Sequence, residues 1–315
     1  MSTSKKIQAK SIIFCFLTIF VIRGQKLRKI NDDELNVVVI GDAGFPESES
    51  QIKRMVVSRI REKHAQRPFQ LGIILGDNVY ETGSEKDDFE TLNQIFGISF
   101  PPHIFDFDFL TVLGNHDHMG DPDTQIRFHL EYDPRFYMPD RNYHYDVKLI
   151  DNTSIRFVCV DSTPLYDYRL ITPENRSTII RLLIELLDNS REFDYVFLIL
   201  HHNVLRGCGP HRRVPDDVHF TKLTTHKYLS AIINGHNHNM QMLGRIMIHP
   251  PVFTVGNSAL ADPVGASESE NAWCRSPETG GFGQLIISNK LTKIRYFSGK
   301  GQLLVDAELD KGQRT

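Results

Sequence analysis

The sequence is poor in cysteine, has no excess of positive charge and has no apolar run long enough to span a membrane. It contains four cysteines among 315 residues and has a formal net charge of −3 at pH 7. This charge balance argues against a surface for nucleic acid. We find no internal repeat, no low-complexity segment and no boundary between independent domains. With 40% hydrophobic and 24% charged residues, the chain has the composition of a globular protein that buries a large core.

The N-terminus carries an uncharged run over residues 11–22, which is short of the roughly 20 residues that span a bilayer. Three lysines precede the run, and Arg23 and Gly24 follow it. This order of basic, apolar and small residues is typical of a secretory signal peptide. We therefore predict a signal peptide over residues 1–24 and a single domain over residues 25–315. An uncleaved membrane anchor is the alternative.

Secretion would allow disulfides to form. One of the four cysteines lies within the predicted signal. Cys159 lies in the apolar stretch IRFVCVD and is expected to be a buried thiol, whereas Cys208 and Cys274 lie in loop-like stretches and could pair. The sequons at Asn152 (NTS) and Asn175 (NRS) fit a secreted glycoprotein.

Strand-like apolar runs alternate with helical patterns along much of the chain. The predicted strands cover residues 36–40, 71–75, 109–113, 154–160, 195–200 and 228–233. Residues 51–65 have the apolar periodicity of a helix, and Thr172 can cap a second helix with Pro173 at its first position. The pattern predicts an α/β sheet covered by helices, followed by a strand-rich tail over residues 251–307.

Polar residues follow five of these strands. The five blocks are GDAG at residues 41–44, GDNVY at 76–80, GNHDH at 114–118, His201-His202, and GHNH at 235–238. Open α/β sheets bind ligands beyond the carboxyl ends of their strands, where loops converge. A single such block is a turn, whereas five of them indicate a site.

The residue types in these blocks suit metal ions. Two carboxylates, an amide, three imidazoles and a phenol can hold two hard or borderline cations, and one carboxylate can bridge both. The absence of a thiolate excludes a cysteine-rich zinc site. Phenolate is a strong anionic donor to a trivalent ion, for which ferric iron is the biological candidate.

The five blocks resemble those of the metallophosphoesterases, and in particular of the small, tartrate-resistant type of purple acid phosphatase. They match that family's pattern GDxG, GDxxY, GNH[DE], strand-end His and GHxH in order, and the resemblance extends from about residue 36 to 297. It implies a four-layer α/β/β/α sandwich with two mixed sheets flanked by helices. The implied function is a secreted acid phosphatase, monomeric and without a nucleic-acid partner, in an extracellular, lysosome-like or vacuole-like compartment. Such an enzyme hydrolyses phosphate monoesters by attack of a metal-bound hydroxide.

The resemblance also implies a role for each residue. The implied ligands are Asp42, Tyr80 and His238 for ferric iron, Asn115, His201 and His236 for a divalent iron, zinc or manganese ion, and Asp77 as the bridge. His116 is implied to lie on the substrate side and to protonate the leaving alkoxide. Asn78 is expected to be only a turn residue.

Several histidines leave alternatives open. His201 and His202 compete for one position; the resemblance selects His201, and alternation along the strand would turn His202 away. Asp117 and His118 are expected to orient ligands rather than to bind metal. His211, in GCGPHRR, is a candidate second imidazole on the substrate phosphate, and a solvated loop histidine is the alternative.

The sequence departs from the family pattern in three places. Ala43 stands where the mammalian-type enzymes usually have tryptophan, which removes no ligand. Residues 161–174 are shorter than the family's protease-sensitive loop, which argues against regulation by cleavage there. The cysteines do not follow the family's usual disulfide arrangement.

Two other interpretations fit the sequence less well. A phosphodiesterase or nucleotide hydrolase on the same scaffold is the runner-up, and Tyr80 argues against it because divalent-only members usually lack that phenolate. A binding protein on an inactive scaffold is disfavoured because every ligand position is filled. Nothing in the sequence predicts a pocket for a base or sugar, so we expect little discrimination among leaving groups.

Overall fold

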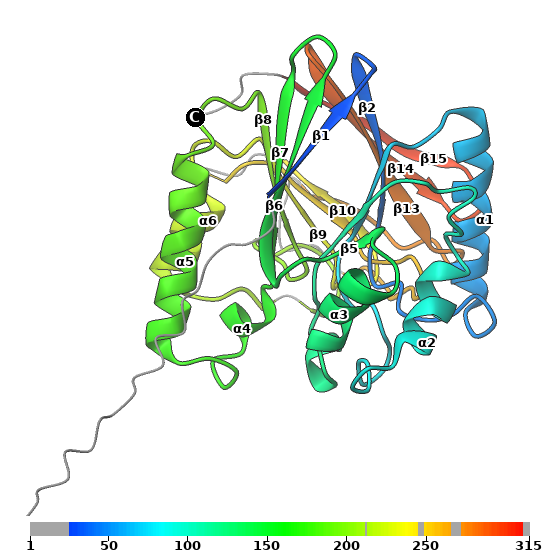
Figure 1. The fold of residues 1–315 in the computed structure, drawn as a ribbon, viewed down its shortest axis with the longest axis horizontal. Helices are drawn as coiled ribbons and strands as arrows, with labels where there is room; N and C mark the ends of the chain where they lie inside the picture. The colour runs from blue at the N-terminus through cyan, green and yellow to red at the C-terminus, as the bar shows by residue number, and fades with distance from the viewer. Residues whose placement is uncertain (1–24, 212, 245–248, 266–271, 311–315) are drawn as a thin grey trace, which may run out of the picture.

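The computed structural model describes residues 25–211, 213–244, 249–265 and 272–310. The predicted signal peptide therefore lies outside the described residues, as does Arg212 of the basic pair beside His211. The described strands form two mixed sheets, one of eight strands and one of seven (Figure 1).

The eight-stranded sheet contains, in order across it, β1 (Gln25–Ile30), β6 (Asn142–Leu149), β7 (Ser154–Val160), β8 (Tyr195–Leu200), β9 (Ala231–Asn234), β11 (Val252–Val255), β10 (Met240–Leu243) and β12 (Ala272–Arg275). The seven-stranded sheet contains β15 (Leu303–Asp310), β14 (Leu291–Ser298), β13 (Gly281–Ser288), β2 (Glu34–Ile40), β3 (Leu71–Ile74), β4 (Phe109–Thr111) and β5 (Phe136–Tyr137). Strands β2 to β5 run parallel in one sheet, and β7, β8, β9 and β11 run parallel in the other.

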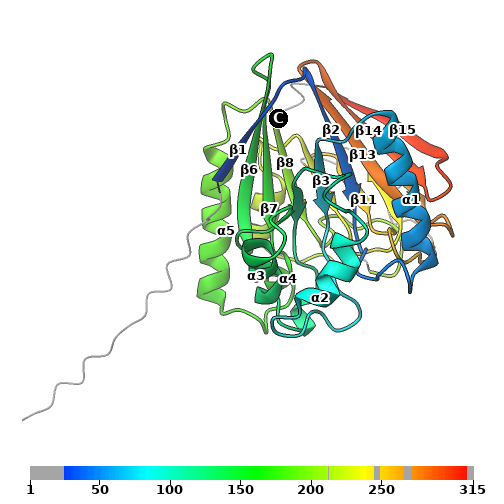
Figure 2. The ribbon, with the colours of Figure 1, turned by 45° about the vertical axis from the view of Figure 1, so that its right-hand side comes forward.

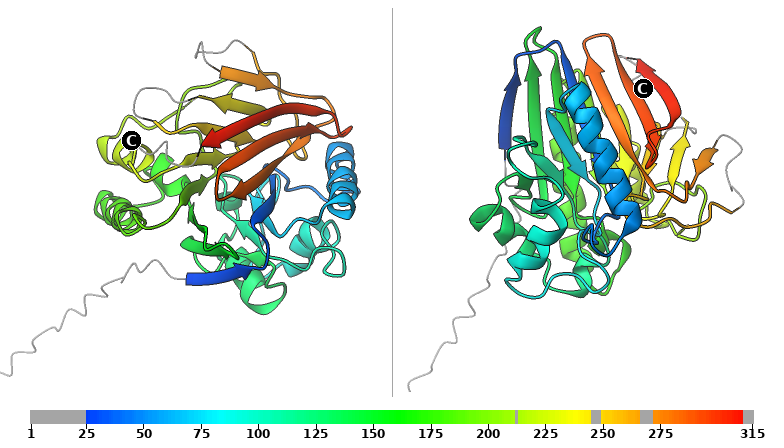
Figure 3. Two further views of the ribbon diagram at one scale, coloured as in Figure 1. Left: turned by 90° about the horizontal axis from the view of Figure 1, so that it is seen from above. Right: turned by 90° about the vertical axis from the view of Figure 1, so that its right-hand side faces the viewer.

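The helices lie on the outer faces of the two sheets and at one end of the molecule. They are α1 (Gln51–Gln66), α2 (Phe89–Leu92), α3 (Asp123–Glu131), α4 (Thr163–Tyr166), α5 (Pro173–Asp188) and α6 (Val218–Thr224), with a π-helical turn η1 (Asn93–Gly97) and a 3-10 turn η2 (Asp117–Met119). Figures 1 and 3 show α5 and α6 on one side of the strands and α1 on the other. The layers are therefore helix, sheet, sheet and helix, in agreement with the predicted fold class. No helix of the described residues has the length and apolar character needed to cross a lipid bilayer.

Strand β8 shows why the sheets are sandwiched. Its sequence YVFLIL is buried throughout, because it packs on both faces. Phe197 and its alternate neighbours belong to the core cluster that also contains Leu110 of β4, whereas Leu198 packs in a second cluster with Leu183 of α5. Fully burying such a side chain contributes about 1.5–3 kcal/mol. Two apolar faces thus hold the strand between the other sheet and the helices.

Residues at the N-terminus of a helix determine where it begins. The Thr172 hydroxyl oxygen accepts a hydrogen bond from the backbone N–H of Asn175, with Pro173 in the first turn of α5, as predicted. The predicted helix over residues 51–65 is α1, which ends one residue later. The strand predicted over residues 228–233 instead covers Ala231–Asn234, because Tyr228 belongs to a turn that follows α6. Strands β1 and β6, at one edge of the larger sheet, were not predicted.

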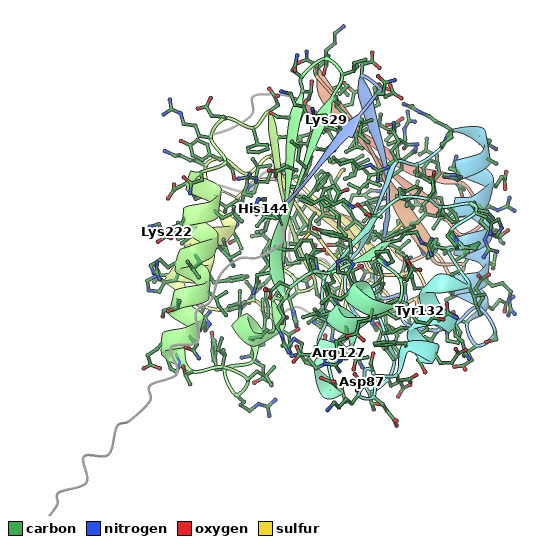
Figure 4. The ribbon with its side chains drawn as sticks, in the orientation of Figure 1. Lys29, Asp87, Arg127, Tyr132, His144 and Lys222 are labelled. Atoms are coloured by element: carbon green, nitrogen blue, oxygen red, sulfur yellow. A yellow bond between two sulfur atoms is a disulfide. The ribbon has the colours of Figure 1, made fainter. Side chains whose placement is uncertain are left out.

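Arg127 of α3 forms two ion pairs at the molecular surface. Its Nε lies 2.6 Å from Oδ1 of Asp87, in the loop after β3, and its Nη2 lies 2.7 Å from Oδ2 of Asp121, just before α3. Asp87 and Arg127 are labelled in Figure 4. Exposed pairs contribute only about 0.2–1 kcal/mol, so they add little to the stability of the fold. Helices α2, α3 and α4 gather at the same end of the molecule (Figures 1 and 2).

Candidate dinuclear metal centre

The carboxyl ends of parallel strands from both sheets bring the predicted ligands together. They follow β2 (Asp42), β3 (Asp77 and Tyr80), β4 (Asn115), β8 (His201) and β9 (His236 and His238). Each sheet therefore supplies part of the site, and none of the contributing loops could form it alone.

Among the described residues, two groups that could each hold a metal ion share one carboxylate. The first group is Asp77, His201 and His236, and the second is Asp42, Asp77 and His238. Within each group the ligand atoms lie within 4.8 Å of one another. Asp77 belongs to both groups, which is the arrangement that a bridging carboxylate requires.

The remaining two predicted ligands complete these groups. The Tyr80 hydroxyl oxygen lies 3.2 Å from Oδ1 of Asp42, 3.1 Å from Oδ2 of Asp77 and 3.2 Å from Nε2 of His238. Oδ1 of Asn115 lies 3.1 Å from Nε2 of His201. The structure thus places the phenol in the group of Asp42 and the amide in the group of His201.

Four of these residues have a backbone conformation that L-residues seldom adopt. Asp42, Asp77, His236 and His238 have φ angles of 54°, 52°, 74° and 47°. A left-handed conformation costs about 1–2 kcal/mol per residue, and such strain is concentrated at functional sites. Hydrogen bonds in the surrounding structure stabilise these backbone conformations. The His236 backbone N–H, for example, donates to Oδ2 of Asp42 at 2.8 Å.

Glycines before the ligands allow the loops to approach closely. A Cβ atom on Gly114 would lie 2.1 Å from Oδ1 of Asp77, and one on Gly76, whose φ is 87°, would lie 2.7 Å from Nδ1 of His201. Any other residue would collide with a ligand at either position. The glycines of GDNVY and GNHDH are therefore required by the geometry of the site.

Two imidazoles are oriented through the nitrogen that faces away from the cluster. Nδ1 of His201 lies 2.7 Å from the Leu75 carbonyl oxygen, and Nδ1 of His238 lies 2.8 Å from Oδ2 of Asp262. Donation from Nδ1 leaves the Nε2 lone pair available for a metal ion. Neither partner was predicted from the sequence. Asp262 lies in the stretch ALADP, whereas a backbone carbonyl carries no sequence signal.

The electrostatics of the cluster favour the binding of cations. Burial and then the neighbouring Asp77 raise the pKa of Asp42 well above its ordinary value. Burial, followed by Asp42 and Asp77, also raises the pKa of the Tyr80 phenol. Burial lowers the pKa of His201 and His236, which favours the neutral imidazole that binds metals. A bound cation reverses the shifts of the carboxyl and phenol groups, so this donor set fits two metal ions.

His116 lies at the rim of the cluster and is half-buried. Its backbone N–H donates to Oδ1 of Asp77 at 2.9 Å, and its ring packs edge-on against Tyr80 with centroids 4.8 Å apart. Nδ1 lies 2.5 Å from the carbonyl oxygen of Glu81. This contact leaves Nε2 as the ring nitrogen that can face a substrate.

Asp117 and Asn78 connect the loops that carry the ligands. The Asp117 carboxylate accepts hydrogen bonds from the backbone N–H groups of Asn78 at 2.9 Å and Gly114 at 2.8 Å. Burial and then Asp77 raise its pKa to about 7. Asn78 is buried, and its Nδ2 donates to the Val112 carbonyl oxygen at 2.9 Å. The expectation that Asn78 is only a turn residue is therefore wrong.

His202 lies closer to the site than its sequence position predicted. Its Nδ1 lies 2.9 Å from Oγ of Ser162, and its ring stacks on Tyr166, yet that ring also lies 4.6 Å from the ring of His236. The side chain is not turned away from the site, because the chain bends immediately after β8. His118 holds a different position, with Nε2 2.9 Å from Oδ2 of Asp161.

His211 is exposed at the opening of the site. Its ring centroid lies 4.8 Å from that of His236. A disulfide joins Cys208 to Cys274 and so connects the loop of His211 to β12, while Cys159 is a buried free thiol. The sequence left open whether His211 lies at the site or is a solvated loop histidine. The structure places it at the opening of the site.

A groove of about 790 Å³ leads away from the cluster. Asn115 and His236 lie at its inner end, and its walls include Met119 and Tyr168, both exposed, with Arg213. A volume of this size is in the range of ligand pockets. The expectation of little discrimination among leaving groups stays a prediction.

Comparisons with known proteins give consistent results. The family model described as calcineurin-like phosphoesterase matches residues 35–240. Purple acid phosphatase 17 of Arabidopsis thaliana is 24% identical over 254 residues, covering 73% of this chain and 72% of that protein. Tartrate-resistant acid phosphatase type 5 of Sus scrofa is 26% identical over 275 residues, 76% of each chain. A solved structure described as "GAP50 the anchor in the inner membrane complex of Plasmodium" has a TM-score of 0.78 at 15% identity, covering 90% of this chain and 91% of that one.

Proposed function

Because this chain belongs to the calcineurin-like phosphoesterase family, we propose that it is a dinuclear-metal acid phosphatase that hydrolyses phosphate monoesters. The observation that carries the proposal is the position of Asp77 in both ligand groups. The similarity to a purple acid phosphatase of Arabidopsis thaliana and to a tartrate-resistant acid phosphatase of Sus scrofa supports the same activity.

Ferric iron and a divalent ion of iron, zinc or manganese are the proposed metals. Tyr80 supports iron in the group of Asp42 and His238, because a phenolate favours a trivalent cation. The neutral donors Asn115, His201 and His236 suit the divalent ion. When bound, the two cations would neutralise charge on the phosphoryl group and lower the pKa of coordinated water.

His116 is the proposed proton donor. The Glu81 carbonyl oxygen accepts the proton on Nδ1 and holds the ring, so a second proton on Nε2 is available to the leaving oxygen. The backbone hydrogen bond from His116 to Asp77 fixes the distance between the donor and the metal cluster. His211 is proposed to contact the substrate phosphate from the opposite side, next to His236.

The groove is proposed to hold the leaving group. It begins at Asn115 and His236 and reaches the exposed side chains of Tyr168 and Met119, which offer apolar surface to an aromatic alcohol. The enzyme would therefore accept leaving groups larger than a simple aryl ring. A monoester fits the cluster better than a diester, because its terminal phosphoryl group carries two negative charges and one substituent.

A secreted, glycosylated monomer is proposed for the mature protein. The disulfide between Cys208 and Cys274 is of the kind that persists in oxidising compartments. Asn152 is exposed and follows β6 in a turn, where a glycan can be accommodated. An acidic compartment or the extracellular space would suit the proposed activity.

Two other functions fit the fold. The Plasmodium structure is described as an anchor, and at 15% identity the likeness concerns the fold alone. The clustering of ligand-type side chains around Asp77 favours hydrolysis over a purely structural role. A phosphodiesterase or nucleotide hydrolase is disfavoured by Tyr80, whose hydroxyl faces two carboxylates and an imidazole.

Kinetics with paired aryl phosphate mono- and diesters between about pH 4 and 8 test the proposal. We expect faster hydrolysis of the monoesters and a bell-shaped profile centred in acid. A preference for diesters, or an optimum above neutrality with ferric iron in place, would support the phosphodiesterase alternative.

A further inference from the structure

A buried lysine lies directly beside the loop that carries Asp42. Lys53 of α1 is 2% exposed, and its Nζ donates a hydrogen bond to the Ala43 carbonyl oxygen at 2.6 Å. The same nitrogen lies 6.0 Å from the centre of the Phe100 ring. Burial lowers the pKa of this amine from 10.5 to about 7, against an opposing influence of Glu47. A lysine is seldom fully buried unless its amine is paired.

The Lys53 side chain lines a small space beside this loop. A cavity of about 10 Å³ is bounded by Lys53, Ala43 and Asn78 and otherwise by apolar side chains such as Phe96 and Phe100. About 10–15 Å³ is the least space in which a protein holds one water molecule. The small side chain of Ala43 helps to leave this space open.

A second polar atom near the cavity lacks a partner. Oδ1 of Asn78 is buried and accepts no hydrogen bond within the described part of the chain, although Nδ2 of the same amide donates to Val112 and Gln125. Leaving such an acceptor unsatisfied costs about 1–3 kcal/mol. Lys53 has further N–H groups beyond the one that binds Ala43. A residue with spare donors and a residue with an unsatisfied acceptor thus line the same cavity.

We propose that this cavity holds one water molecule that joins Nζ of Lys53 to Oδ1 of Asn78. Ala43 directly follows Asp42, and Asn78 directly follows Asp77. The water would therefore link the loops that carry two carboxylates of the metal cluster, with α1 as the common support. Helix α1 is itself fixed at its start, where Ser50 Oγ donates to the Ala259 carbonyl oxygen at 2.8 Å. Lys53 then acts as a positioning residue for the cluster.

Crystallography of the wild-type protein and Lys53→Met tests the water directly. Methionine has nearly the same length as lysine but no donor. We expect density for a water molecule within hydrogen-bond distance of Lys53 and Asn78 in the wild-type protein, and none in the variant. An empty cavity in the wild-type protein would overturn the proposal, whether or not the variant folds.

Titration of Zn²⁺ into the metal-free protein tests the positioning role. Lys53→Met should weaken binding by about 10-fold, the lower limit of effects seen when partners of metal ligands are removed. Lys63→Met is the matched control, because Lys63 lies on the same helix with its Nζ over the Phe297 ring, 4.1 Å from its centre. Lys53→Gln, which keeps an N–H donor, should recover part of the affinity. Equal Zn²⁺ affinities in all four proteins would refute the positioning role.

The bridging role of the carboxylates rests on the proposed function, but neither readout measures hydrolysis. A water in the cavity together with weaker Zn²⁺ binding would support the proposal even in a protein that hydrolyses no phosphate ester. Failure of hydrolysis with both readouts intact would refute the proposed function alone.

Discussion

The hydroxyl oxygen of Tyr80 lies 3.2 Å from Nε2 of His238, although 158 residues separate them in the chain. Tyr80 follows β3 of one sheet, and His238 follows β9 of the other. The contact therefore depends on the packing of the two sheets, and it assigns both side chains to the same proposed ion.

Tyr80→Phe tests the ferric assignment. If Tyr80 binds ferric iron, the purified protein should be violet to pink from a phenolate-to-iron charge-transfer band, and the variant should lose this colour. An absorption spectrum of each protein checks the prediction. A colourless wild-type protein with full activity and bound zinc or manganese would refute iron and leave the two-metal site in place.

His116→Ala tests the proton donor. The variant should retain both metals, because the His116 ring belongs to neither ligand group, and should lose about 10²–10⁴ in rate. His103→Ala, at an exposed loop histidine, is the control and should behave like the wild-type protein. Loss of metal from His116→Ala would show that it is a ligand.

Tyr168→Ala tests the groove. The loss of an aromatic contact worth about 0.5–1.5 kcal/mol should lower kcat/KM for a bulky aryl ester such as 4-methylumbelliferyl phosphate by about 2- to 13-fold. Turnover of methyl phosphate should change little, because its leaving group does not reach the groove wall. Tyr132→Ala is the matched control, since both tyrosines are 51% exposed and Tyr132, which directly follows α3, is not among the residues that line the groove (Figure 4). Equal losses for both esters would argue against the groove as the leaving-group site.

The buried amine of Lys53 should affect stability in alkaline solution. Its pKa is lowered from 10.5 to about 7 in the folded protein, so between these values the unfolded chain binds the proton and the folded chain does not. The free energy of unfolding of the wild-type protein, measured relative to Lys53→Met, should therefore rise as the pH increases from about 7 to 10.5. Below about pH 7 the difference should be constant. Urea unfolding at several pH values measures it, and a flat difference across the whole range would contradict the burial of a shifted amine.

Much of the site could be predicted because its residues directly follow apolar strands. Asp42, Asp77 and Asn115 each come after a glycine at a strand end, and this local pattern needs no knowledge of the fold. Asp262 lies 24 residues from His238 and meets it only through the packing of loops. Such long-range contacts leave no periodicity in the sequence.

The fold shows the same difference between features that a local sequence pattern reveals and features that it does not. Strand β8 was predicted because it is apolar throughout. Strand β6, with the sequence NYHYDVKL, was missed although its alternation of polar and apolar residues is itself a strand pattern. The cavity beside Lys53 was also beyond prediction, because it arises where α1 packs against two loops. Burial of a lysine is decided by the fold rather than by its neighbours in sequence.

Hydrolysis of p-nitrophenyl phosphate at acid pH by the metal-loaded protein, compared with Asp77→Asn, tests the central claim most directly. Asp77 belongs to both ligand groups, so neutralising its charge should weaken both sites together. We predict ready hydrolysis by the wild-type protein and almost none by Asp77→Asn. No hydrolysis by a wild-type protein with two bound metal ions, or equal rates in the two proteins, would contradict the account.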